Sequence, residues 1–111
     1  MKNGIYKLTF NTNVNINGNL DGVVVINDGA INGGGNVSYY QGVINGKKAL
    51  VKSIPYNEND PTAFNGTEPL DLDLTIQDHG NHHIFKGHIK DDPSNTIFGK
   101  LDFLNHLINK H

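Results

Sequence analysis

Apolar and polar residues alternate with a period of two along much of this chain, which is typical of β-strands with one buried face. The alternation is clearest in residues 70–77, where four apolar residues take turns with Asp71, Asp73, Thr75 and Gln77. The apolar sets of the alternating strands are expected to point into one core. They are Tyr6, Leu8, Phe10, Leu70, Leu72, Leu74, Ile76, Phe85 and Ile89.

Turn-forming residues separate the strands. Asp28-Gly29, Asn45-Gly46 and Gly80-Asn81 are typical of tight turns, because glycine, asparagine and aspartate accept a positive φ. A further turn is expected at residues 92–95, and a flexible loop at the asparagine-rich residues 11–19. The pattern predicts strands at residues 4–10, 20–26, 30–32, 36–44, 47–54, 70–77, 82–90 and 96–103.

Three segments fall outside the alternation. The triplet Gly33-Gly34-Gly35 cannot pack a core, so we expect a bend, a bulge or the close approach of another backbone there. Residues 55–69 form a long connection, in which Asp60 and Pro61 are suited to begin one helical turn through Phe64. At the end of the chain, helical spacing predicts a short amphipathic turn or a frayed end over Leu101, Leu104, Leu107 and Ile108.

About eight strands with no long helix between them predict an all-β fold in one domain over residues 1–111. Consecutive hairpins build an antiparallel meander. About eight strands are enough to close into a small up-and-down, lipocalin-like β-barrel, here with a short helical turn. A two-sheet sandwich is the alternative. The barrel is favoured because nearly every connection is hairpin-length, whereas Greek-key sandwiches need long crossovers.

Composition and charge narrow the range of functions that the sequence allows. The formal net charge is −2 and the pI is about 6.3, which argues against direct nucleic-acid binding, since such domains usually carry a basic patch. The chain has no cysteine, so a disulfide framework and a thiolate metal site are excluded. No apolar run approaches the roughly 20 residues of a membrane helix, and the start has no signal-peptide pattern. We expect a soluble, cytoplasmic protein with no membrane partner.

The residues suited to chemistry do not assemble into a catalytic site. His79, His82 and His83 suggest a metal site, but adjacent strand residues point to opposite faces, so solvated loop histidines are favoured. Asp71 and Asp73 share one face, where a solvated surface is favoured over acid–base work. The glycine triplet lacks the lysine and the helix that a phosphate loop requires. We expect no enzymatic activity, no cofactor and no metal.

Two strands carry apolar residues on both faces. The outward set consists of Val23 and Val25 in residues 20–26, and of Leu50 and Ile54 in residues 47–54. In a lone barrel these side chains would form a patch in water, and large apolar patches usually mark an interface. A homodimer through this wall is therefore expected.

Short elements spread over most of the chain carry a family resemblance. They are Asn3-Gly4-Ile5-Tyr6, Gly22-Val23-Val24-Val25, Asp28-Gly29, Gly34-Gly35-Asn36, Tyr40-Gln41-Gly42, Tyr56-Asn57 and Pro61-Thr62-Ala63-Phe64-Asn65-Gly66. Together they resemble the GrlR family, a bacterial group named for a negative regulator of type III secretion genes. The resemblance implies a lipocalin-like barrel, a homodimer, no catalysis, and transcription regulation through protein binding.

The resemblance also implies a partner protein. The regulator that gives the family its name sequesters a transcriptional activator through an acidic loop after the strand with Tyr-Gln-Gly. Here that position reads Asn45-Gly46-Lys47-Lys48, with the charge reversed, and Asn36 stands where many members have Asp. Lys47 and Lys48 would repel a basic activator, or they only keep the hairpin soluble. A partner contact is then expected in residues 57–66, where Glu58 and Asp60 form the nearest acidic pair.

A small-molecule or lipid carrier that uses the barrel interior is the rival function on the same fold. A continuous apolar cavity of a few hundred Å³, able to take a small apolar ligand, would favour the carrier. A filled interior would favour the protein-binding function. Tyr39 and Tyr40 are expected either to line such a pocket or to pack in the core.

Overall fold

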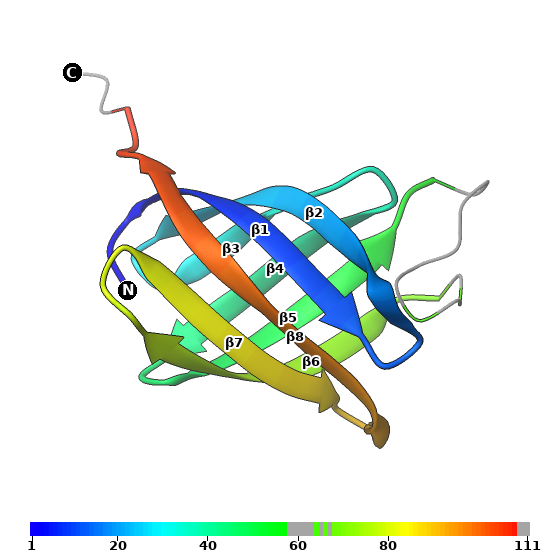
Figure 1. Ribbon diagram of the computed structural model, residues 1–111. Coiled ribbons are helices and arrows are strands. Elements are labelled where there is room, and N and C mark those ends of the chain that lie inside the picture. The colour runs from blue at the N-terminus through cyan, green and yellow to red at the C-terminus, as the bar shows by residue number, and fades with distance from the viewer. Residues whose placement is uncertain (58–63, 65, 67, 109–111) are drawn as a thin grey trace.

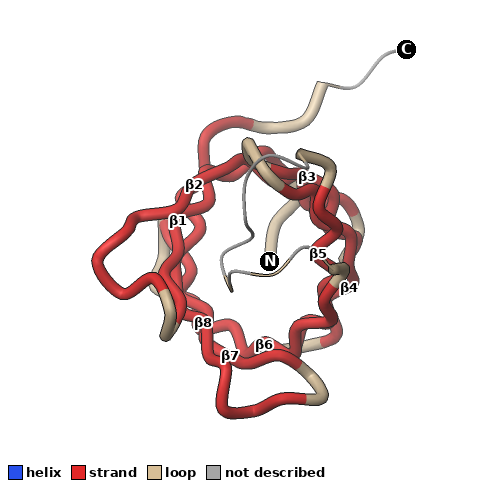
Figure 2. Tube along the Cα trace, turned by 90° about the vertical axis from the view of Figure 1, so that its right-hand side faces the viewer, coloured by secondary structure: helices blue, strands red, loops and turns tan. Residues whose placement is uncertain are grey.

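The chain folds into a closed antiparallel β-barrel of eight strands, which follow one another around the barrel in sequence order (Figures 1 and 2). The computed structural model describes residues 1–57, 64, 66 and 68–108. The strands are β1 (Gly4–Thr12), β2 (Asn15–Asn27), β3 (Ala30–Gly34), β4 (Ser38–Asn45), β5 (Lys48–Pro55), β6 (Leu70–Asp78), β7 (His82–Ile89) and β8 (Asp92–Asn105). Pairing of β8 with β1 closes the barrel. The predicted up-and-down barrel is confirmed, and the two-sheet sandwich is wrong.

The barrel has two different ends. The turns β2–β3, β4–β5 and β6–β7 lie with the first residues of the chain at one end, the amino-terminal end. The turns β1–β2, β3–β4 and β7–β8 lie at the other end, the mouth end, together with the long connection from β5 to β6 (Figure 1). No helix in the described residues is long and apolar enough to cross a membrane.

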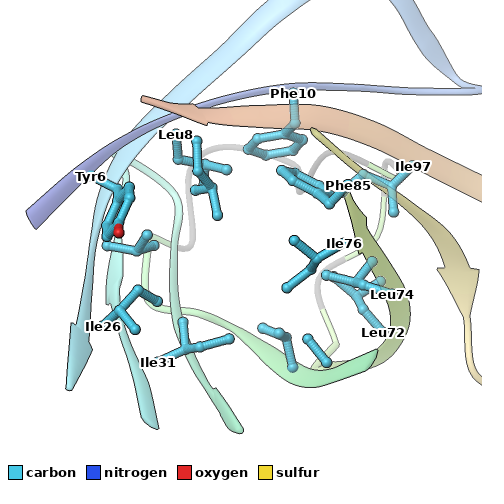
Figure 3. Close-up of a cluster of buried hydrophobic side chains, with 14 residues drawn as sticks. Tyr6, Leu8, Phe10, Ile26, Ile31, Leu72, Leu74, Ile76, Phe85 and Ile97 are labelled. Atoms are coloured by element: carbon cyan, nitrogen blue, oxygen red, sulfur yellow. The ribbon is translucent and has the colours of Figure 1, made fainter. Parts of the chain in front are cut away.

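The core lies inside the barrel, where the apolar side of each alternating strand points (Figure 3). Tyr6, Leu8 and Phe10 of β1 are buried, as the alternation predicts. The other predicted core residues are Leu72, Leu74, Ile76 and Phe85, which are buried, and Leu70 and Ile89, which are half-buried. Since each strand has a period of two, this inner set fixes which residues face water.

The flexible loop expected at residues 11–19 is wrong. β1 continues to Thr12 and β2 begins at Asn15, so only Asn13 and Val14 turn the chain. The Asn13 backbone N–H donates to the Thr96 carbonyl oxygen at 3.1 Å, and its side-chain oxygen accepts from the Thr96 N–H at 3.0 Å. Polar composition suggests a loop, but here β8 supplies partners for the asparagine groups.

Two expectations near the end of the chain are also wrong. The β7–β8 turn lies at Lys90 and Asp91, and residues 92–95 begin β8 as an irregularity in its pairing with β7. The Asp92 carboxylate accepts hydrogen bonds from the Ser94 and Asn95 side chains. Such local side-chain hydrogen bonds are typical of turns, but here they lie inside a strand. β8 then runs to Asn105, so residues 101–105 form strand rather than a helical turn, whereas residues 106–108 have no regular secondary structure, which fits the alternative of a frayed end. The helical turn expected from Asp60 and Pro61 lies outside the described residues.

The glycine triplet allows a close approach of neighbouring backbone, one of the three uses expected for it. A Cβ atom on Gly33 would lie 2.2 Å from the Val23 carbonyl oxygen, and one on Gly35 would lie 2.7 Å from the Asp21 carbonyl oxygen. Any side chain at these positions would therefore collide with β2. The triplet keeps β3 and the start of the β3–β4 turn tight against β2.

Candidate functional site

The barrel interior holds a cavity of about 550 Å³. Its walls are mostly aliphatic and aromatic side chains from all eight strands, such as Leu8, Val24, Ile31, Leu74, Phe85 and Ile97. Figure 3 shows labelled side chains of this set pointing inward around an open centre. Pockets that bind small molecules in proteins span about 300–1,000 Å³ and are mostly apolar. The cavity is therefore large enough and apolar enough to hold a small molecule.

The amino-terminal end of the cavity is closed. Tyr6 is fully buried there, and its hydroxyl donates a hydrogen bond to the Lys2 carbonyl oxygen at 2.7 Å. The Tyr6 ring packs edge-on against Phe103, with ring centroids 5.5 Å apart, and the Lys2 ammonium lies 3.8 Å from the centroid of Phe103. Asn3 exchanges two hydrogen bonds with Asp28 of the β2–β3 turn. The first residues therefore lie across this end of the barrel (Figure 2).

His83 is part of the same closure. It is 7% exposed, packs edge-on against Tyr6, and its Nε2 lies 3.6 Å from a carboxylate oxygen of Asp78. Its buried Nδ1 has no hydrogen-bond partner among the described residues. Burial lowers the pKa of His83, and the Asp78 carboxylate only partly opposes this. The neutral imidazole is thus the form that fits this packed end.

Among the described residues, the mouth end of the cavity is open. Exposed residues of the rim, including Asp21 of β2 and Asn36 of the β3–β4 turn, line the cavity together with buried ones. Phe64, from the connection between β5 and β6, is half-buried and also lines it. A ligand would therefore enter from the mouth end.

Three hydroxyl groups interrupt the apolar lining near the mouth. Ser38 and Tyr40 lie two residues apart on the inner face of β4, and Ser53 of β5 is the cross-strand partner of Tyr40. None of the three hydroxyls has a hydrogen-bond partner in the described part of the chain. We call these three residues the hydroxyl cluster.

Tyr40 is the titratable member of the hydroxyl cluster. Its ring meets Phe10 edge-on, with centroids 6.4 Å apart, so it stands inside the barrel. Burial, with a smaller contribution from Tyr56, raises the pKa of Tyr40 to about 12. Tyr56 in turn donates a hydrogen bond to the Gly35 carbonyl oxygen at the rim. Of the two uses expected for the tyrosine pair, Tyr40 lines the pocket, whereas Tyr39 is on the outer face and 39% exposed.

The sequence indicated the alternation that puts Ser38 and Tyr40 on one face of their strand, but not that this face is the inner one. Serine on an inner face breaks the apolar pattern, so the hydroxyl cluster was missed as a site. The missed signal was the pairing of Tyr40 with Ser53, which places three hydroxyls side by side. Only the strand register, which the hairpin turns fix, could have revealed it.

Of the four residues predicted to meet a partner protein, the structure describes Lys47 and Lys48. Lys47 is exposed in the β4–β5 turn, at the amino-terminal end. Lys48 lies in β5, where its Nζ is 3.7 Å from a carboxylate oxygen of Asp73 and donates to the Thr75 hydroxyl at 3.3 Å. Glu58 and Asp60 lie outside the described residues.

The four residues expected to form a dimer wall do not make one continuous surface. β3 and β4 separate β2 from β5, and Val23 is 46% and Leu50 50% exposed, whereas Val25 and Ile54 are half-buried. Two exposed residues that were not predicted extend the wall: Tyr39 lies opposite Ile54, and Val43 opposite Leu50. Between these two apolar rows runs a polar one, made of Asn32, Gln41 and Lys52.

The polar clusters considered in the sequence lie on the surface or apart. Asp71 and Asp73 share the outer face of β6, and each pairs with a lysine of β5. His79 and His82 stack with ring centroids 5.5 Å apart, whereas His83 points inward, so the three do not converge. Among the described residues no group of three histidine, aspartate or glutamate side chains could hold a metal ion.

Comparison with known protein families and with curated proteins finds no match for this chain. Membership of the GrlR family therefore stays a prediction.

Proposed function

We propose that this protein binds a small, largely apolar molecule inside its barrel, as a carrier or a sensor without catalysis. The single observation that carries this proposal is the apolar cavity of about 550 Å³, closed at the amino-terminal end and open at the mouth. A protein interior is normally packed with few voids larger than a water molecule, so a cavity of this size needs an explanation. A bound molecule is the simplest one.

The size of the cavity limits the ligand. A methylene group takes up about the volume of a water molecule in the liquid, roughly 30 Å³, so the cavity holds on the order of 10 to 15 carbon atoms with incomplete packing. Each methylene buried there contributes about 0.8 kcal/mol of transfer free energy. A chain of that length therefore gains about 8–12 kcal/mol from burial. After an association cost of about 4 kcal/mol, this corresponds to binding between millimolar and micromolar concentrations.

A neutral fluorescent probe, N-phenyl-1-naphthylamine, tests this proposal. Its emission should rise on mixing with the protein and saturate at one probe per chain. Ala49 is buried and lines the cavity, so Ala49→Phe should weaken probe binding at least tenfold. The matched control is Leu50→Phe, which adds a ring to the neighbouring residue on the outer face. Equal probe binding by the two variants, or no saturable binding by the parent, would contradict the proposal.

A second function, binding of a regulatory partner protein, is supported by the exposed apolar rows of β2 to β5. Val43 and Leu50 lie opposite each other and are 57% and 50% exposed. Apolar side chains gathered on one wall favour an interface, and the resemblance to the GrlR family favours a homodimer with a transcriptional activator as further partner. Affinity capture with the parent and with Val43→Lys/Leu50→Lys tests this. A partner retained equally by both proteins would place its binding surface elsewhere.

A further inference from the structure

The hydroxyl cluster carries an inference about the chemical class of the ligand. Ser38, Tyr40 and Ser53 lie on the inner faces of β4 and β5 close to the mouth of the cavity, where the polar residues Asn15, Asp21 and Asn36 also line it. Binding pockets commonly combine an apolar lining with a few polar groups that fix the orientation of the ligand. A ligand that fits both features has an apolar tail and one polar head.

Hydrogen bonding favours a head group that can both donate and accept. Each hydroxyl of the cluster has one proton to donate and lone pairs to accept with, and none has a partner in the described part of the chain. A purely apolar ligand would displace water from these groups and leave them unpaired, which costs free energy. A hydroxyl head group would replace the lost hydrogen bonds.

Charge argues against an anionic head. Among the described residues that line the cavity, none is lysine, arginine or histidine, and Asp21 at the rim is the only one with a carboxylate. A carboxylate at the hydroxyl cluster would thus be desolvated without a counter-charge.

The behaviour of Tyr40 agrees with this electrostatic argument. Burial raises the pKa of Tyr40 to about 12, because the environment around its oxygen disfavours a negative charge. A ligand oxygen at hydrogen-bond distance would meet the same environment. The site therefore suits a neutral oxygen better than an anionic one.

We propose that the ligand is a single-chain amphiphile with a neutral, hydroxyl-bearing head held by Ser38, Tyr40 and Ser53, and that the site discriminates against fatty carboxylates. This rests on the proposed function, since it names the ligand class of the same cavity. The apolar tail would extend from the mouth toward the closed amino-terminal end, past Leu74 and Ile76.

A pair of ten-carbon ligands tests the head-group preference. 1-Decanol and decanoate have the same tail, and decanoate is fully ionised at about pH 8. Each is titrated against protein loaded with N-phenyl-1-naphthylamine, and displacement gives its affinity. Decanol should bind at least tenfold more tightly than decanoate, which corresponds to about 1.4 kcal/mol. Equal affinities, or tighter binding of decanoate, would overturn the inference.

A tyrosine pair supplies the variant and its control. Tyr40→Phe removes one hydroxyl from the cavity. Tyr39→Phe removes a hydroxyl from the adjacent residue, which lies on the outer face of the barrel. Tyr40→Phe should weaken decanol binding about 3- to 10-fold, the range expected for one neutral hydrogen bond, and weaken probe binding less. Tyr39→Phe should change neither. Unaltered decanol binding by Tyr40→Phe, or an equal loss of decanol and probe affinity, would also overturn the inference.

The double variant Ser38→Ala/Ser53→Ala guards against a misfolded Tyr40 variant. It should weaken decanol binding more than probe binding. The two proposals fail separately in these experiments. Absence of saturable probe binding by the parent would overturn the cavity function, whereas probe binding without a preference for decanol would overturn only the head-group inference.

Discussion

A hollow barrel and a packed barrel respond in opposite ways to a larger side chain at Ala49. This residue is 1% exposed, and it faces the cavity from β5. Ala49→Leu adds three carbon atoms. At about 0.8 kcal/mol per buried carbon the gain has an upper limit of about 2.4 kcal/mol, and about 1 kcal/mol is expected because the cavity is open at one end. In a filled core the same change would cost about 1–3 kcal/mol.

The control is a smaller change at a filled position. Gly87 of β7 also belongs to the inner side of its strand, but a Cβ there would lie 2.0 Å from the Asp73 carbonyl oxygen. Gly87→Ala should therefore destabilise by about 1–3 kcal/mol although it adds only one carbon. Chemical denaturation followed by far-ultraviolet circular dichroism measures both variants, on protein freed of bound lipid because a ligand would add its own stabilisation. A loss of stability above 1 kcal/mol in Ala49→Leu would refute the hollow interior.

Three further predictions concern the core, the closed end and assembly. Leu72→Asp should lower the free energy of unfolding by several kcal/mol, since it puts a carboxylate among buried side chains; a thermal melt like that of the parent would contradict this. The pKa of His83 is lower in the folded protein than the ordinary histidine pKa of 6.5. The neutral His83 side chain therefore contributes fully to the stability of the fold above pH 6.5, and this contribution is lost as the pH falls toward the folded-state pKa. The free energy of unfolding should therefore decrease from about pH 7 to about pH 5, and it should decrease less over this range in the His83→Phe variant. Light scattering at micromolar concentration should return twice the chain mass of 12.2 kDa, and Val43→Lys/Leu50→Lys should return the single mass; a parent of single mass would rule out the dimer.

The alternation of apolar and polar residues was enough to predict most of the fold. In β6 the four apolar residues of 70–77 were enough to predict a strand, its inner face and its place in the core, because the two faces of that strand differ sharply in polarity. The turns at Asp28-Gly29, Asn45-Gly46 and Gly80-Asn81 were equally clear. Their residues have the positive φ that the dipeptides predict: Asp28, Gly29, Gly46 and Gly80.

The errors arose where strand residues are polar. Asn11, Asn13 and Asn15 suggested a loop, since nothing in the local sequence indicates that Thr96 would pair with the Asn13 backbone and side chain. The partner is more than 80 residues away, beyond the reach of any local pattern. Long-range pairing overrides propensity in the same way at Asp92, whose turn chemistry is absorbed into β8.

The candidate site could be predicted only in outline. A closed barrel of eight strands indicates an interior of limited width, but whether side chains fill it depends on the volumes of residues from all strands at once. A small residue on the inner face, Ala49, leaves room that no single strand pattern reveals. The hydroxyl cluster needs the register between β4 and β5 as well.

The location of a bound apolar molecule tests the central claim most directly. Isotope-filtered nuclear Overhauser spectra of the ¹³C-labelled protein with unlabelled N-phenyl-1-naphthylamine report which side chains lie next to the probe. Contacts from the probe to the methyl groups of Leu74 and Ile76 and to the Phe85 ring are predicted, since these line the cavity. Contacts confined to Val43 and Leu50 on the outer wall, or none at saturating probe, would contradict ligand binding inside the barrel.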